Sequence, residues 1–228
     1  MKKLLMTACV LAGIGAATPA FAIPTSEVQY LLSSFVGTGS PASGPYGTVT
    51  LDQIGSNVMV TVALDSPPSA GFVDTGAGSA LLFNLMNVPT ITITGLTAGY
   101  TLVSTTNGDI HADGSGDWDF AITCAAGTSP ACGTGGSNPA PGPFSFTVDN
   151  VLLSQFIPND SNYYFASDLC IGTVSNTGGC IGATGDVVAT AGTVTQVPEP
   201  STLALFGAGL MAFWALRRRI WRAKSTLA

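Results

Sequence analysis

Short runs of alternating apolar and polar residues recur along most of this chain. In residues 58–64, three valines and a leucine occupy every second position, with Met59, Thr61 and Ala63 between them. Because a strand has a side-chain period of two, this run predicts a strand with one face on a core. Residues 53–57 precede it with the turn residues Gly55, Ser56 and Asn57, and therefore predict a hairpin turn.

Similar β-prone runs, separated by Gly, Ser, Thr and Asn, predict further strands at residues 28–32, 48–52, 81–85, 90–96, 100–105, 117–124, 144–148, 163–171 and 186–191. Residues 150–156 predict one short helix, and the Gly-, Pro- and Ser-rich residues 127–143 predict a long exposed loop. Long helical periods are few. The expected fold class is therefore all-β, a β-sandwich or a jelly roll.

The pattern changes at the N-terminus. Lys2 and Lys3 precede the apolar residues 4–17, and Ala20-Phe21-Ala22 has the small-x-small form that signal peptidase requires. The apolar run is too short to span a bilayer. Residues 1–22 therefore predict a secretory signal peptide, with signal peptidase as a partner and cleavage after Ala22.

The pattern changes again at the C-terminus. Residues 202–216 are uncharged and mostly apolar, and as a helix they would extend about 22 Å at 1.5 Å per residue. A hydrocarbon core is about 30 Å thick, so the flanking arginines must snorkel to complete a membrane span. Arg217, Arg218 and Arg219 follow at once, and the positive-inside rule keeps them cytoplasmic while the preceding residues face outward.

Val197, Pro198, Glu199 and Pro200 stand just before the apolar segment. This order of motif, hydrophobic helix and basic tail resembles the PEP-CTERM sorting signal. An ordinary C-terminal membrane anchor is the alternative, but it does not require the Pro-Glu-Pro sequence. We expect a signal peptide at 1–22, an exported all-β domain at 23–196 and the sorting signal at 197–228.

The resemblance implies recognition by an exosortase, a membrane-embedded, cysteine-dependent enzyme that removes or exchanges the C-terminal helix during export. It also implies an association with exopolysaccharide and the biofilm matrix of Gram-negative bacteria. The expected route therefore begins with a precursor held in the inner membrane by the C-terminal helix. It ends at the cell surface or in the extracellular matrix, where an exopolysaccharide is a further expected partner.

Charge is distributed unevenly along the chain. The seven basic residues all lie in the two ends, while the thirteen Asp and Glu all lie between Glu27 and Glu199. The exported domain therefore contains no Lys or Arg. Because phosphate groups are bound by cationic side chains, this composition excludes nucleic acid and anionic lipid as partners of the domain.

Four cysteines remain after signal-peptide removal: Cys124, Cys132, Cys170 and Cys180. An even number in an exported chain predicts two disulfides. Of the three possible pairings we favour the local one, Cys124 with Cys132 and Cys170 with Cys180. No C-x-x-C spacing is present, which argues against a zinc ribbon.

The domain offers little for catalysis. Its single histidine, His111, lies in an acidic segment that predicts an exposed turn, and no G-x-S-x-G nucleophile elbow exists. We therefore expect no enzyme activity and no cofactor, although Asp pairs leave a secreted hydrolase as a distant alternative.

The strongest local cluster is Asp109, Asp113, Asp117 and Asp119 among glycines. Oxygen ligands on a curling chain suit Ca²⁺, but the EF-hand pattern is not met. A Gly-rich hairpin with solvated aspartates is therefore the favoured interpretation, and a calcium site is the alternative.

The sequence thus predicts a non-enzymatic structural or adhesive protein of the envelope or matrix. A glycan-binding module is the alternative, with Tyr46, Trp118, Tyr163 and Tyr164 as an aromatic platform, although aromatic residues on strands more often pack in a core.

Overall fold

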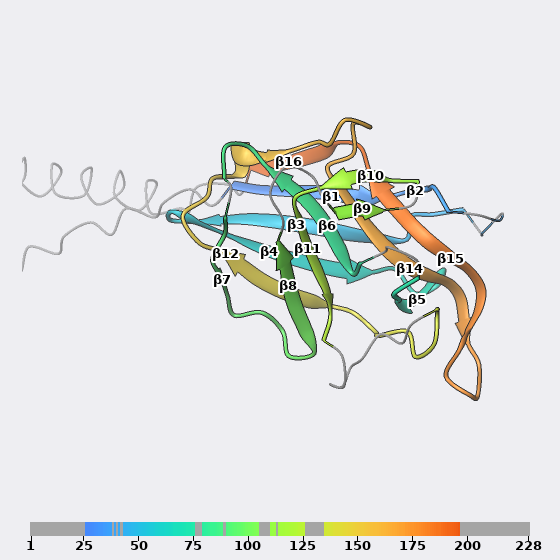
Figure 1. The fold of residues 1–228 in the computed structure, drawn as a ribbon. Coiled ribbons are helices and arrows are strands. Elements are labelled where there is room, and N and C mark those ends of the chain that lie inside the picture. Colours follow the sequence, from blue (N-terminus) through green and yellow to red (C-terminus); the bar gives the residue numbers. More distant parts are fainter. Residues whose placement is uncertain are drawn as a thin grey trace, which may run out of the picture. The chain divides into compact units, whose positions relative to one another are not determined.

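The computed structural model describes residues 26–37, 39, 41, 43–75, 79–88, 90–104, 110–112, 114–125 and 135–196, all within the unit Pro24–Pro198. They form two antiparallel sheets and a separate two-stranded hairpin (Figure 1). The all-β prediction is confirmed.

The first sheet has six strands, all paired antiparallel. Their order across the sheet is β16 (Gly192–Gln196), β1 (Ser26–Leu32), β3 (Gly47–Ile54), β4 (Asn57–Leu64), β12 (Phe144–Val148) and β7 (Ile93–Thr94). The β3–β4 hairpin turns at Gly55 and Ser56, as predicted, because Ile54 pairs with Asn57. Gly55 has a φ of 63°, and a glycine at the first position of such a turn is typical of type II′.

The second sheet contains eight strands. The main path is β2 (Ser34–Phe35), β15 (Cys180–Ala189), β14 (Phe165–Val174), β6 (Leu81–Leu85), β11 (Phe120–Cys124) and β8 (Tyr100–Ser104). Off this path, β13 (Phe156–Ile157) pairs with β6, and β5 (Ser69–Phe72) pairs with β14. A 3-10 turn, η1 (Leu153–Gln155), stands where a short helix was predicted.

The core lies between the two sheets. Val58, Val60 and Val62 are completely buried, as the alternation in β4 predicts. Phe146 from the first sheet and Phe83 from the second meet with ring centroids 6.0 Å apart. Burying each such side chain stabilises the fold by about 1.5–3 kcal/mol. The two sheets therefore form a β-sandwich.

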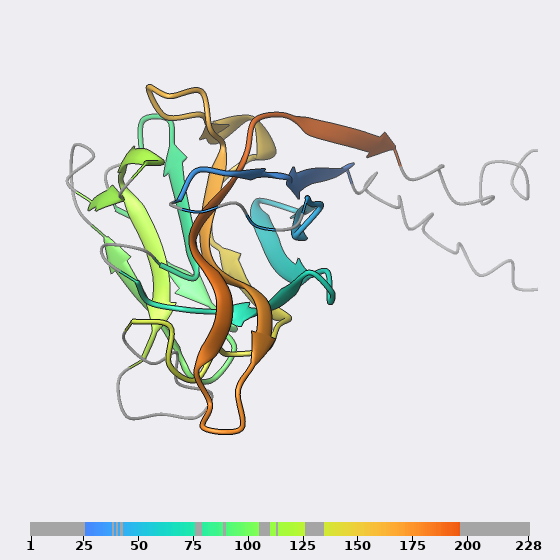
Figure 2. The same cartoon turned by 90° about the vertical axis from the view of Figure 1, so that its right-hand side faces the viewer.

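A second, smaller core covers the outer face of the eight-stranded sheet. The hairpin of β9 (Ile110–Ala112) and β10 (Gly116–Trp118) lies there, on the side away from β1 (Figure 2). The buried members of this layer are Leu82, Ala112, Trp118, Ala121, Ala166 and Val188. Alternation explains the arrangement: in β6, Leu81 and Phe83 face the sandwich core while Leu82 faces the hairpin.

Several sequence predictions were wrong in detail, among them that of residues 186–191, where β15 spans Cys180–Ala189. Residues 90–96 form only the two-residue edge strand β7, which the positive φ of Gly95, 63°, follows. Residues 117–124 are not one strand, because the Asp119 N–H donates to Asn84 Oδ1 at 2.7 Å between β10 and β11. Within 127–143, Ala140 is fully buried and bridges Phe72, so the described part of that segment is not an exposed loop.

Candidate functional site

The two ends of the domain lie side by side. Ser26 of β1 pairs with Gln196 of β16, at the edge of the six-stranded sheet, and Figure 2 shows the start of β1 and the end of β16 on the same side of the sandwich. Val197 follows Gln196 directly. The predicted sorting residues therefore begin directly after the last strand.

The sorting segment itself, including Val197, Pro198, Glu199, Pro200 and the basic tail Arg217–Arg218–Arg219, lies outside the described residues. So do the predicted signal peptide and the apolar residues 202–216. Within the described part of the chain, no helix is long and apolar enough to cross a membrane.

The acidic segment is partly described. His111 and Asp117 are cross-strand partners in the β9–β10 hairpin. Their side chains are 70% and 65% exposed, and Nδ1 lies 2.6 Å from Oδ1. His111 therefore lies in a strand and contacts a carboxylate. The prediction that it is exposed is confirmed, and the prediction that it lies in a turn is wrong.

The calcium alternative stays a prediction. Asp119 is half-buried, whereas Asp117 is exposed, and Asp109 and Asp113 lie outside the described residues. Among the residues that the structure describes, no group of three or more His, Cys, Asp or Glu is arranged to hold a metal ion.

One disulfide is formed as predicted. Cys170 and Cys180 are bonded, with Cα atoms 5.7 Å apart, across the β14–β15 hairpin. Cys124 is also disulfide-bonded, and its predicted partner, Cys132, lies outside the described residues.

The aromatic platform is not formed. Tyr46 is 3% exposed and Trp118 is completely buried, because Trp118 fills the layer between the hairpin and the eight-stranded sheet. Tyr164 packs on Tyr30, with ring centroids 5.2 Å apart. Tyr163 is half-buried against the same hairpin layer as Trp118. All four rings therefore pack on the two cores, and the predicted platform is absent from these described residues.

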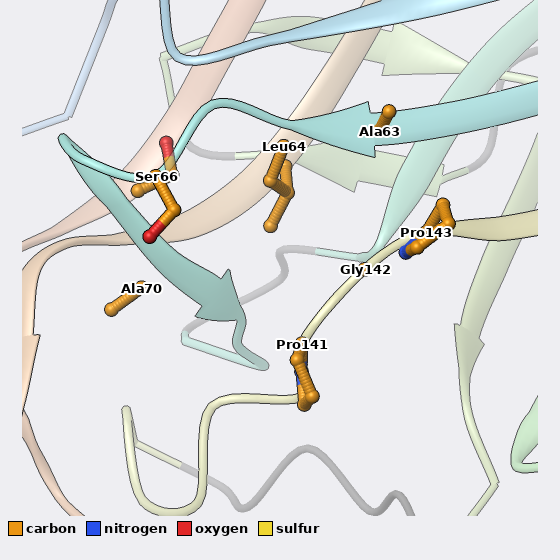
Figure 3. A pocket seen from close by; sticks show the side chains of 8 residues that line it. Ala63, Leu64, Ser66, Ala70, Pro141, Gly142 and Pro143 are labelled. Carbon is orange, nitrogen blue, oxygen red and sulfur yellow. The ribbon is translucent and has the colours of Figure 1, made fainter.

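A small pocket opens at the end of β4 (Figure 3). Its volume is about 170 Å³, and Leu64, Pro141 and Pro143 are among its lining residues. The hydroxyl of Ser69, which also lines it, donates to the Tyr46 carbonyl at 2.7 Å. The pocket therefore offers space for a small apolar group.

Two buried carboxylates are the feature that sequence reasoning missed. Asp168 of β14 and Asp186 of β15 are direct cross-strand partners and are 0% and 3% exposed. Thr75 donates its backbone N–H to Asp168 Oδ2 at 2.5 Å and its hydroxyl to the same oxygen at 2.7 Å. Ser115 donates its hydroxyl to Asp186 Oδ2.

Burial raises the pKa of Asp168 to about 7. The hydrogen bonds from Thr75 oppose this rise, whereas the neighbouring carboxylates Asp186 and Asp74 add to it. The sequence does contain one signal of this burial: Asp168 is the only charged residue in the run from Phe165 to Ile171. Successive residues of a strand point to opposite faces of the sheet, so a charged residue is buried when both faces are covered.

Residues 196–219 match the family model of the PEP-CTERM protein-sorting motif. The match includes the Pro-Glu-Pro sequence, the apolar segment and Arg217–Arg219. It indicates a protein that is exported and sorted by an exosortase, with a membrane-anchored precursor. Comparison of the chain with curated proteins and with solved structures gave no match.

Proposed function

We propose that this chain is a non-enzymatic structural or adhesive protein that an exosortase delivers to the cell envelope or extracellular matrix, where it associates with exopolysaccharide. The observation that carries the proposal is the sorting motif at residues 196–219, which begins at the last residue of the sandwich edge strand β16.

The compact, disulfide-bonded sandwich supports a structural role. Its core joins the two sheets through Phe83 and Phe146, and the Cys170–Cys180 bond closes the longest hairpin. The buried pair Asp168 and Asp186 is closed to a substrate, since it is 0% and 3% exposed. A non-enzymatic role is in keeping with these features.

The outer face of the six-stranded sheet supports an adhesive role. The strand registers place five uncharged polar residues in one row across β16, β1, β3, β4 and β12, namely Thr193, Gln29, Thr50, Thr61 and Ser145. Neighbouring strands lie about 4.8 Å apart, so the row extends over roughly 19 Å. Hydroxyl and amide groups on a face without cations suit a neutral polysaccharide.

The experiment is cosedimentation of the processed protein with exopolysaccharide from the producing strain. Thr50→Lys, in the middle of the row, should weaken retention by about 1 kcal/mol, which is roughly fivefold. Thr101→Lys is the matched control, because Thr101 is exposed on β8 of the other sheet. Equal retention of both variants and the wild type would show that this face does not bind the polysaccharide. If the wild type itself is not retained, the proposed association with exopolysaccharide is wrong.

A further inference from the structure

Asp168 and Asp186 lie on the outer face of the eight-stranded sheet, beneath the β9–β10 hairpin. Phe165 and Leu169 of β14 face the sandwich core, while Ala166 faces the hairpin layer, so Asp168 shares the face of Ala166. Asp186 is the direct partner of Asp168 in β15. Directly opposite residues on one face of an antiparallel pair have Cβ atoms about 4.5–5.5 Å apart, so the two carboxyl groups are neighbours.

No lysine or arginine of the domain compensates this pair. Among the described residues, Thr75 and Ser115 donate to the two carboxylates, and both are neutral. Two ionised carboxylates side by side in a buried site repel strongly, and such pairs retain one proton well above the ordinary carboxyl range.

The other titratable groups of the described elements around the pair are carboxylates and one histidine. Asp74, which follows β5, raises the pKa of Asp168 further. From the covering hairpin come His111 and Asp117, which bind each other on its exposed side, and Asp119 follows the hairpin as a half-buried residue. Asp113, between β9 and β10 in the sequence, lies outside the described residues.

The pair is connected to the hairpin through Ser115. The Ser115 hydroxyl donates to Asp186, and Trp118 Nε1 donates to the same hydroxyl oxygen at 3.3 Å. The Asn159 amide donates to the Ser115 carbonyl at 2.7 Å and fixes the turn. Trp118 in turn covers the outer face of the sheet and is completely buried.

We propose that Asp168 and Asp186 share one proton and act as a pH-sensitive latch, which holds the β9–β10 hairpin on the sheet while the proton is bound and loosens it when both carboxylates ionise. This device goes beyond the proposed sorting and adhesive function. It would make the covering layer of an exported domain respond to the external pH.

The direction of the effect follows from linkage. The pKa of Asp168 in the folded protein is raised to about 7, whereas an Asp in an unfolded chain titrates near 3.9. The folded state therefore binds the proton more tightly, and the stabilisation is complete below the unfolded pKa. It is lost as the pH rises through the folded pKa, that is, between about pH 4 and about pH 7.

The test uses the purified full-length chain in detergent with Trp214→Phe and Trp221→Phe, which leaves Trp118 as its only tryptophan. We expect the urea midpoint to fall between about pH 5 and about pH 7, and acrylamide quenching of Trp118 to rise at least about twofold as the pH passes through about 7. Asp168→Asn should abolish both changes, because an amide has nearly the shape of the protonated acid and cannot ionise.

Asp160→Asn is the matched control, since Asp160 is exposed, and it should keep both pH responses. If Asp168→Asn does not fold, Asp186→Asn provides the same comparison. The two carboxylates do not share a proton if the wild-type urea midpoint is constant or rises over this range. The same conclusion follows if the pH response survives both Asn substitutions. If the midpoint falls but the quenching of Trp118 does not change, ionisation does not loosen the β9–β10 hairpin and the proposed latch is wrong.

Discussion

Gly172 of β14 and Gly182 of β15 are direct cross-strand partners, and a Cβ on either would collide with the carbonyl oxygen of the opposite strand. The oxygens concerned belong to Ile181 and Ile171. The φ angles of the two glycines are 146° and 148°, which side chains rarely permit. The close approach of β14 and β15 at this pair therefore requires glycine at both positions.

Gly182→Ala should destabilise the domain by at least about 2 kcal/mol, since both backbone strain and a collision are introduced. Gly179→Ala is the matched control in the same hairpin: its nearest contact, Ser175 Oγ, would be 3.5 Å from the new Cβ. Urea unfolding of both variants measures the difference. Equal midpoints would contradict the close approach of the two strands.

Tyr100→Phe should stabilise the domain by about 1 kcal/mol. The ring stacks on Phe144 with centroids 4.4 Å apart, and this packing survives the substitution. The buried hydroxyl, however, has no hydrogen-bond partner among the described residues. Its burial raises the pKa of Tyr100 to about 12. A lower urea midpoint for the variant would show that the hydroxyl is satisfied after all.

Loss of the Cys170–Cys180 bond should lower the free energy of unfolding by about 2–3 kcal/mol, since the bond closes a short loop. The two cysteines are separated by 10 positions. Cys170→Ser/Cys180→Ser is the variant, and thermal unfolding is the measurement. Alkylation of the unreduced mature protein should modify no thiol, and two or more modified thiols would refute the predicted pair of disulfides.

Replacing Pro198, Glu199 and Pro200 with Ala should leave a membrane-retained precursor, because the sorting motif spans these residues. Fractionation followed by mass spectrometry of the C-terminus detects the difference. Glu27→Ala is a suitable control: this acidic residue lies on β1, outside the motif, and its processing should be normal. Normal processing of the triple variant would mean that exosortase does not use the Pro-Glu-Pro sequence.

Calcium should not shift the melting temperature of the domain. A site occupied at a hundredfold excess over Kd would add about 2.7 kcal/mol, and such a gain is easily seen in a melt with Ca²⁺ and with chelator. Asp113→Ala/Asp117→Ala provides the comparison. A rise in the wild type that is absent from this variant would establish the calcium alternative.

Periodicity predicted the strands that pack on the main core. Residues 81–85 and 144–148 form β6 and β12 with the predicted bounds. In β12 the buried positions alternate with period two, whereas β6 is an apolar run with both faces covered. The hairpin layer was not predicted. Nothing in the alternation of β6 reveals that Leu82 is covered by Trp118, since that contact depends on a hairpin distant in the sequence.

The buried carboxylates were missed for a related reason. Asp168 and Asp186 are ordinary acidic residues in the sequence, and their burial depends on Thr75 and Ser115, which lie about 90 and 70 residues away. Local pattern does not specify such contacts. The sorting motif was predictable because its elements are consecutive in the chain.

The pairing of Ser26 with Gln196 also affects the order in which the domain can be completed. β1 is the first described strand to be synthesised and β16 the last, so this contact has nearly the largest sequence separation that the domain permits. Contacts of this kind form late, because a long loop must close before they give any stabilisation. The six-stranded sheet therefore reaches its full width only when the chain is available as far as Gln196, which is also the first residue of the sorting motif.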